Sequence, residues 1–264
     1  MIKRVKIKIS NFSSSIDNQR SGFREIILSN IKLLIYSNSI NTLVGLSGIG
    51  KSSLYKSIFR IFPFNSKGEN DFYDDYSRKY VSLNLLKTEE IYENIIGKKV
   101  IILDQNPFAC LNPYLRIIEQ FIYLLKEHKT QNEIIEQSIK IMYELNLKKP
   151  KEILWSLPNE LSGGMLQRVI LAMSLLKEPE VIIGDEFLSA LDIDTKNIIL
   201  NFLKDKIKKT SLTVVWITHD IYSCLKYSHF INIINRHRKI TFSGSTNVFK
   251  SIVFKKQNLI NFFY

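Results

Sequence analysis

The sequence predicts an α/β fold built on a parallel sheet, and three observations support this prediction. The short apolar runs 100–103 and 181–184 are typical of strands that are buried on both faces of a parallel sheet. A glycine-rich loop at 45–52 joins an apolar run to a stretch whose apolar residues have helical spacing. The glycine-free segment 114–147 carries Leu, Ile, Glu and Lys at three- and four-residue spacing, which predicts helices.

The bulk composition indicates a soluble globular protein. The chain has 264 residues, of which 45% are hydrophobic and 23% charged, enough to bury one large domain. No stretch approaches the roughly 20 uncharged apolar residues of a membrane span, and the N-terminus lacks the apolar block of a signal peptide. Cys110 and Cys224 are too few for a disulfide framework or a metal–sulfur cluster. We therefore expect a cytosolic protein.

The formal net charge of +12 has two interpretations. It could mark a surface for nucleic acid or for anionic lipid headgroups. However, most lysines are scattered, and basic residues cluster only at 204–209 and 236–239. Charge runs usually lie on solvated faces. We therefore attribute the positive charge to a general abundance of lysine and not to a binding surface.

The first part of the chain alternates between strand, loop and helix patterns. Residues 5–10 alternate apolar with polar side chains, which predicts a half-buried strand, and 11–22 is polar and rich in turn formers. Residues 62–70 are predicted to form a loop. A short helix is expected over 89–96, ended by Gly97.

The second part is predicted to contain helices and then strands. The segment 114–147 should form two helices split at 128–131, the second ending at 148–150 because proline cannot continue it. Further helices are expected up to residues 176 and 208, a strand at 212–217, and a closing hairpin at 231–242.

The glycine-rich loop has the phosphate-binding pattern G-x-x-x-x-G-K-S between a strand and a helix. Its glycines let successive N–H groups point at one anion, and the helix start adds partial positive charge. Lys51 can then reach the β- and γ-phosphates, and the Ser52 hydroxyl can bind Mg²⁺. A simple strand-to-helix turn would not need lysine and serine in this register. The predicted nucleotide-binding residues of the loop are Gly45, Leu46, Ser47, Gly48, Ile49, Gly50, Lys51, Ser52 and Ser53.

Two acidic residues, Asp185 and Glu186, follow the second apolar run. At a strand end, this pair can place one carboxylate at Mg²⁺ and the other beside an attacking water. Alone, the pair could equally be a solvated turn, but the preceding buried strand and the phosphate loop favour a catalytic site. We predict that Asp185 binds Mg²⁺ and that Glu186 is the general base.

A second anion-binding helix start lies at residues 161–167. A serine and two glycines open a helix there, a pattern that by itself could also be a simple helix cap. The stretch resembles the signature motif of the ATP-binding cassette (ABC) transporter ATPases, because Gln105, Asp192 and His219 also occur in that family's order. The resemblance implies that the signature binds the γ-phosphate held by an opposite subunit. The predicted signature residues are Leu161, Ser162, Gly163, Gly164 and Gln167.

The resemblance also implies roles for single residues. Gln105 would contact Mg²⁺ and the attacking water and couple to a membrane subunit, and Asp192 would lie at a dimer interface. His219 would contact the γ-phosphate. Phe23 lies about where the family places an aromatic ring on adenine; Phe12 is its competitor, and a core role for Phe23 is equally compatible.

The segments 105–113 and 158–168 are similar to the peptide and nickel import ATPases, above all to the nickel-type subunits. Phe187 and Leu188 depart from the Pro-Thr that the family usually has there, which leaves the backbone stiffness after Glu186 open.

The expected fold is a P-loop NTPase (RecA-like) ABC cassette forming a single domain, 1–264. It would comprise an antiparallel β part and phosphate-loop core (1–105), an inserted helical subdomain (106–160), and the signature with the second half of the core (161–264).

The resemblance implies an ATP hydrolase that uses ATP and Mg²⁺ to energise import of a small solute, nickel, another metal chelate or an oligopeptide. Its partners would be two transmembrane permease subunits, a second ATPase subunit of the same or another kind, and a solute-binding protein. It would be peripheral at the cytoplasmic face of the cell membrane, with no direct nucleic-acid contact. One alternative is a non-transport ABC-type ATPase that acts on nucleic acid. The net positive charge favours it, but the presence of a single cassette does not. A second alternative, a nucleotide-binding regulator that does not hydrolyse ATP, is disfavoured by Glu186.

Overall fold

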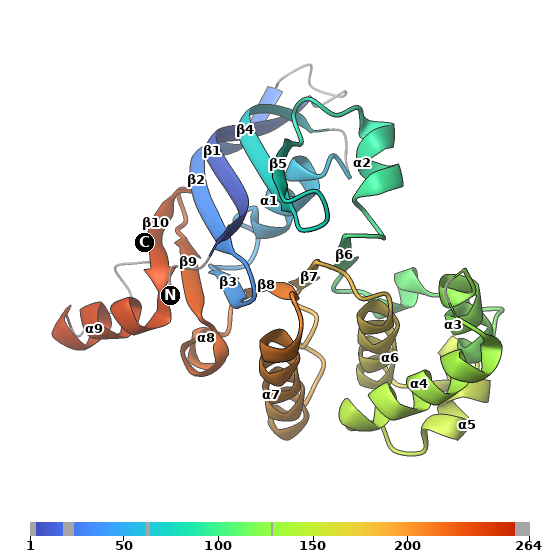
Figure 1. Cartoon of the computed structure of the whole chain (residues 1–264). Helices are drawn as coiled ribbons and strands as arrows, with labels where there is room; N and C mark the ends of the chain where they lie inside the picture. The colour runs from blue at the N-terminus through green and yellow to red at the C-terminus, as the bar shows by residue number, and fades with distance from the viewer. Residues whose placement is uncertain (1–3, 18–23, 62–63, 128, 257–264) are drawn as a thin grey trace.

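The chain folds into two β-sheets and a group of helices (Figure 1). The structure is a computed structural model, and it describes residues 4–17, 24–61, 64–127 and 129–256. One sheet has four strands in the order β2-β1-β4-β5, and the other, the core sheet, has six in the order β10-β9-β3-β8-β7-β6. Among the described residues, no helix is both long and apolar enough to cross a membrane.

The core sheet is parallel except at one edge. Five of its strands run parallel, and β10 pairs with β9 in the antiparallel sense. This confirms the predicted parallel sheet and the closing hairpin. The strands of the core sheet are β3 (Ile40–Val44), β6 (Val100–Leu103), β7 (Val181–Asp185), β8 (Thr213–Thr218), β9 (Phe230–Ile234) and β10 (Ile240–Ser245).

Each face of the core sheet packs against a separate hydrophobic cluster. Val214 and Trp216 of β8 join the cluster with the helices after β7 and β8, whereas Val215 and Ile217 face the antiparallel sheet. Strand side chains alternate between faces, so one strand serves both clusters. The helices flanking this sheet are α1 (Lys51–Ile58), α2 (Thr88–Asn94), α7 (Ile193–Lys209), α8 (Ile221–Tyr227) and α9 (Thr246–Lys256).

The antiparallel sheet is larger than the sequence indicates. Its strands are β1 (Val5–Asp17), β2 (Arg24–Tyr36), β4 (Asn65–Asp74) and β5 (Lys79–Ser82). The prediction of a turn-rich segment from residue 11 is wrong over 11–17, where β1 continues through Ser13, Ser14 and Ser15. The predicted loop is also wrong over 65–70. Ser14 and Ser15 of β1 pair with β2 on one side and β4 on the other, so backbone pairing forms a strand that side-chain polarity argues against.

The chain between β6 and β7 forms four α-helices that group together beside the core sheet (Figure 1). They are α3 (Ile117–Leu125), α4 (Gln131–Glu144), α5 (Pro150–Trp155) and α6 (Gly163–Leu176). The predicted split between two helices is confirmed, and Thr130 caps the second of them. The predicted end of α4 is wrong. The helix ends at Glu144, ahead of Asn146 in a left-handed conformation, and Pro150 instead opens α5 at its first position.

Ion pairs join the antiparallel sheet to the core sheet. The Lys6 side chain is fully buried, and its Nζ lies 2.8 Å from Asp75 and 2.5 Å from Glu180, the residue preceding β7. Lys99, directly before β6, lies 2.6 Å from Asp74. Since buried charges require partners, these pairs fix the antiparallel sheet at the amino ends of the core strands.

The Asp74 pair predicts an acid-sensitive stability. Partial burial favours the neutral carboxyl, but hydrogen bonds from Lys99 and Ser77 outweigh it and hold the pKa of Asp74 at about 2, below the ordinary 3.8. The ionised form therefore stabilises the fold above about pH 4, and this contribution is lost as the pH falls towards 2. Urea unfolding from pH 5 to 2 should give a shallower loss of stability in Asp74→Asn than in the wild type. An identical slope in both proteins would contradict this assignment.

Candidate active site

A cavity of about 530 Å³ lies at the carboxyl ends of the core strands. The phosphate loop enters it from β3, Gln105 from the end of β6, Asp185 and Glu186 from β7, and His219 from the end of β8. Ligands of open parallel sheets bind at this edge, since loops from neighbouring strands converge there. The fold thus brings together predicted residues that lie far apart in the sequence.

The phosphate loop is curled by two left-handed glycines. Gly48 has φ 78° and Gly50 has φ 97°, values that L side chains rarely adopt. Gly50 precedes the first residue of α1, Lys51, whose Nζ donates 2.8 Å hydrogen bonds to the carbonyls of Gly45 and Leu46. The lysine folds back over its own loop and closes a concave backbone surface at the positive end of a helix.

Lys51 as a whole residue is only 6% exposed. Burial lowers its pKa, while the nearby carboxylates of Glu186 and Asp185 oppose that change. A cation that has lost much of its hydration in a cavity gains from an anionic ligand. The arrangement therefore suits phosphate groups.

Asp185 is held by two hydroxyl groups of α1. Ser52 Oγ donates a hydrogen bond to Asp185 Oδ2, and Tyr55 Oη donates to the same oxygen at 3.2 Å. Burial raises the pKa of Asp185, and these hydrogen bonds counteract part of that shift. Tyr55 was missed in the sequence, although it lies three residues after Ser52 and so shares its helix face.

Three oxygen-bearing side chains in the wall of the cavity fit Mg²⁺ as ligands. Ser52, Gln105 and Asp185 line the cavity and supply hydroxyl, amide and carboxylate oxygens, the hard ligands that this ion prefers. Within the described residues no group of three or more His, Cys, Asp or Glu side chains gathers as a metal site. Such a sparse protein contribution suits an ion that also binds the phosphates of a ligand.

Glu186 adopts an unusual backbone conformation. Its φ of 51° lies in the left-handed region, which costs a non-glycine residue about 1–3 kcal/mol. The conformation is held by hydrogen bonds of 2.9 Å from Glu186 N to the Ile217 carbonyl and from Ser189 N to the Glu186 carbonyl. The carboxylate Oε1 lies 2.8 Å from His219 Nδ1. Strained residues of this kind concentrate at functional sites.

The cavity is also lined by Glu25, Ile27 and Arg238. Arg238 sits in the turn between β9 and β10 and donates hydrogen bonds to the carbonyls of Ile26, at 2.8 Å, and Ile27, at 3.2 Å. Its guanidinium lies 4.0 Å from Glu25. In the sequence, Arg238 could be noticed only as part of the basic run 236–239. That run was interpreted as a solvated surface and not as part of a site.

The structure does not test the predicted contact between an aromatic ring and adenine. Phe23 lies outside the described residues. Its competitor, Phe12, is fully buried in the cluster beneath the antiparallel sheet, so its ring cannot stack on a ligand in the cavity.

The signature stretch lies apart from this cavity, and none of its residues is among the described lining residues. Ser162 caps α6, its Oγ accepting a 3.3 Å hydrogen bond from Met165 N. A Cβ built on Gly164 would lie 3.1 Å from Cδ2 of Leu191, which precedes Asp192. The helix start and the loop at Asp192 are therefore neighbours. Arg168, which the sequence did not single out, donates a 2.9 Å hydrogen bond to the Gly164 carbonyl.

The remaining predicted residues of this region differ in exposure. Ser162 and Asp192 are exposed, whereas Leu161 and Gln167 are each 7% exposed. Gln167 Oε1 has no hydrogen-bond partner within the described part of the chain. Asp192 caps α7, and its hydrogen bonds with Thr195 lower the pKa of the carboxyl.

Comparison with known proteins gives consistent matches. The model of the ABC transporter family matches residues 28–189. A dipeptide transport ATP-binding protein of Caldanaerobacter subterraneus is 30% identical over 84% of this chain and 67% of its own length. A nickel import system ATP-binding protein of Staphylococcus aureus is 28% identical over 92% of this chain and 90% of its own length. In fold, the chain is similar to a dimeric bacterial ABC transporter cassette, with a TM-score of 0.77, 24% identity, and coverage of 91% of this chain and 98% of that one.

Replacing Lys51 should weaken nucleotide binding itself. Lys51→Ala removes the buried cation of the loop, and losing a charged hydrogen bond should reduce ATP affinity roughly 10- to 100-fold in a calorimetric titration. Lys56→Ala is the matched control, because Lys56 lies on the same helix but does not line the cavity. Equal ATP affinity in the two variants would refute the proposed phosphate contact.

Proposed function

The chain belongs to the ABC transporter family as an ATP-binding, ATP-hydrolysing cassette, and we propose that it energises import of a small solute through partner membrane subunits. One observation carries the catalytic part of the proposal. A single cavity joins the phosphate loop with Gln105, Asp185, Glu186 and His219, the residues predicted to carry out ATP hydrolysis.

The phosphates of ATP would lie against the N–H groups at the start of α1, with Lys51 at the β- and γ-phosphates. Ser52, Asp185 and Gln105 would hold Mg²⁺, which when bound neutralises charge on the phosphate oxygens. The nucleoside would extend towards Glu25 and Ile27, which also line the cavity, and Phe23 is predicted to stack on adenine.

Glu186 is the proposed general base. Its carboxylate would accept a proton from the water that attacks the γ-phosphorus, while the bond from that phosphorus to the bridging oxygen of ADP breaks. His219 Nδ1, 2.8 Å from Glu186 Oε1, would fix the direction of the carboxylate and reach the γ-phosphate. The Glu186 side chain is 13% exposed and that of His219 is 61% exposed, so the base is sheltered and the histidine lies at the rim.

The complete site would form between two head-to-tail cassettes. Ser162 and Gly164 lie outside their own chain's cavity, so their helix start would bind the γ-phosphate held by a second subunit. The packing of Gly164 against Leu191 supports a shared surface that includes Asp192. The second subunit could be a copy of this chain or a sister ATPase.

A second cavity would receive the membrane partner. A groove of about 490 Å³ lies between β6 and the helices α3 and α6, and Cys110, Leu111 and Tyr123 are among its mainly apolar lining residues. Gln105 lies a few residues before Cys110, so a segment docked in the groove could influence the catalytic cavity. We propose that a permease subunit docks here, which would place the chain at the cytoplasmic face of the membrane, with a second permease subunit on the sister cassette.

The relatives suggest the solute class. They are named for dipeptide transport and for nickel import, so we propose a solute of either kind, delivered by a solute-binding protein. The nucleic-acid alternative gains no support, because Arg238 of the basic run 236–239 contacts the nucleotide cavity instead.

Glu186→Gln should separate chemistry from binding. The amide cannot accept the proton, so turnover should fall roughly 10²- to 10⁴-fold while ATP affinity stays near that of the wild type. A phosphate-release assay and a calorimetric titration measure the two effects. Glu178→Gln is the control, since Glu178 is 78% exposed and does not line the cavity. Turnover near the wild-type rate in Glu186→Gln would exclude Glu186 as the base.

Gly164→Asp tests the composite site. Its carboxylate would face the γ-phosphate across the interface, and like charges at low dielectric oppose closure. In the Glu186→Gln background, light scattering should show that ATP no longer drives association, although each subunit still binds ATP. Gly164→Ala adds the same Cβ without charge and measures the packing contribution, because that Cβ lies 3.1 Å from Leu191. If Gly164→Asp associates as strongly as the protein without this change, the signature stretch only caps α6 and does not bind the partner's γ-phosphate.

A further inference from the structure

We propose that Phe187 is the positioning residue for Glu186, and that it acts by packing its ring across Gly184. The proposal rests on the proposed role of Glu186 as the general base. It assigns a function to the position where this sequence departs from the Pro-Thr of the family it resembles. A proline there would stiffen the chain through its own ring, whereas Phe187 leaves its backbone without that covalent restraint.

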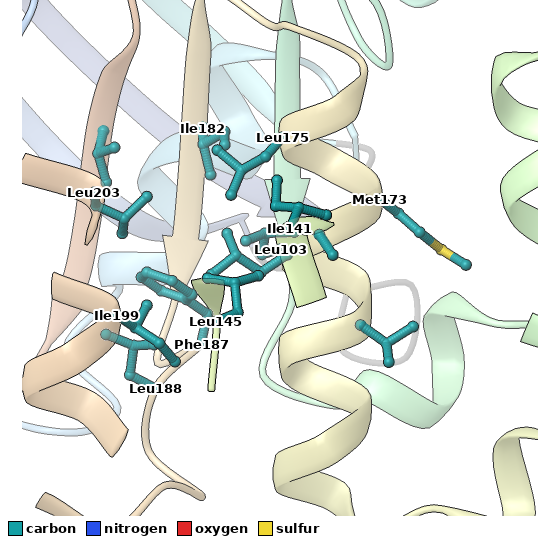
Figure 2. Close-up of a cluster of buried hydrophobic side chains, with 14 of the residues drawn as sticks. Leu103, Ile141, Leu145, Met173, Leu175, Ile182, Phe187, Leu188, Ile199 and Leu203 are labelled. Atoms are coloured by element: carbon teal, nitrogen blue, oxygen red, sulfur yellow. The ribbon is translucent and has the colours of Figure 1, made fainter. Parts of the chain in front are cut away.

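The Phe187 side chain is anchored in the core. It is 3% exposed, although it directly follows Glu186, a residue at the cavity wall. It belongs to the hydrophobic cluster that also contains Leu188 and Ile199, and Figure 2 shows the three side chains at the carboxyl end of β7. A buried aromatic side chain contributes a large apolar area, so this anchor resists displacement.

Gly184 provides the space in which the Phe187 ring lies. A Cβ built on Gly184 would overlap Phe187 Cδ1 and would lie 2.6 Å from Cε1 and 2.7 Å from Cγ. Gly184 is a regular strand residue, opposite Leu103 and Trp216 of the neighbouring strands, and its φ is not positive. Glycine is therefore required here for space and not for backbone conformation.

The two contacts hold Glu186 between fixed points. On the amino side, β7 ends in a strand pairing that extends to Asp185 opposite Ile217, and Glu186 N donates to the Ile217 carbonyl at 2.9 Å. On the carboxyl side, the Phe187 ring is fixed against Gly184. With both neighbours fixed, Glu186 stays in its left-handed conformation, and its carboxylate stays 2.8 Å from His219 Nδ1.

The test is a double-mutant cycle on the full-length chain. Gly184→Ala should displace the ring and misdirect Glu186, lowering kcat roughly 10- to 100-fold, while KM for MgATP and ATP affinity change less than about twofold. Phe187→Ala should also lower kcat by releasing the anchor. Once the ring is absent, the three atoms nearest to the added methyl are gone, so Gly184→Ala in the Phe187→Ala background should change kcat less than about twofold.

Gly244→Ala is the matched control. A Cβ there would lie 3.0 Å from Cζ of Phe242, so this variant also crowds a phenylalanine ring, but on β10. It should affect thermal stability and leave kcat unchanged. Phe187→Leu keeps apolar bulk and should retain more activity than Phe187→Ala, which tests the anchor even if Gly184→Ala does not fold.

A crystal structure of Gly184→Ala provides a readout that does not depend on turnover. The distance from Glu186 Oε1 to His219 Nδ1, 2.8 Å in the wild type, should exceed 3.5 Å. Glu186→Gln in the same assays separates the two proposals: wild-type turnover in that variant would refute the general base itself. A low rate for Glu186→Gln with wild-type kcat for Gly184→Ala and Phe187→Ala would overturn only the role of Phe187. Multiplicative losses in the double mutant would overturn its coupling to Gly184.

Discussion

The burial of the central strands on both faces is the constraint on which the rest of the structure depends. Residues of β3 and β8 alternate between two hydrophobic clusters, one shared with α6, α7 and α8 and the other with α1 and the antiparallel sheet. A sheet covered on both faces offers a ligand only its strand ends. The phosphate loop, Glu186 and His219 therefore meet at one edge, and loops that share no sequence continuity form one cavity.

Within that cavity, burial acts on two groups of opposite charge. Burial disfavours the charged forms of both Lys51 and Asp185, and each is held by hydrogen bonds with neighbouring groups. In the proposed complex, phosphates and Mg²⁺ would complement these charges, so the site would gain most from the intact nucleotide. The signature of a second subunit would complete the charge balance only when ATP is bound, which would couple association to the nucleotide.

Two local features adapt the common fold to this sequence. Arg238 links the β9–β10 turn to β2 through the carbonyls of Ile26 and Ile27 beside the cavity. Gly184 and Phe187 form a complementary pair, in which the absence of one side chain accommodates the other. The packing of Phe187 against Gly184 offers a physical account of how Glu186 keeps its orientation although no proline follows it.

The sequence alone predicted the parallel sheet, the phosphate loop at 45–52, and the order of the later motifs, because apolar runs and glycine patterns are local signals. It did not predict that β1 continues through Ser13, Ser14 and Ser15, since that strand is formed by pairing with residues distant in the chain. The contacts of Arg238 with β2 and of Phe187 with Gly184 were likewise decided by the tertiary structure. Local patterns report which backbone conformations a segment favours, whereas long-range packing alone determines which side chains meet and how much room each one has.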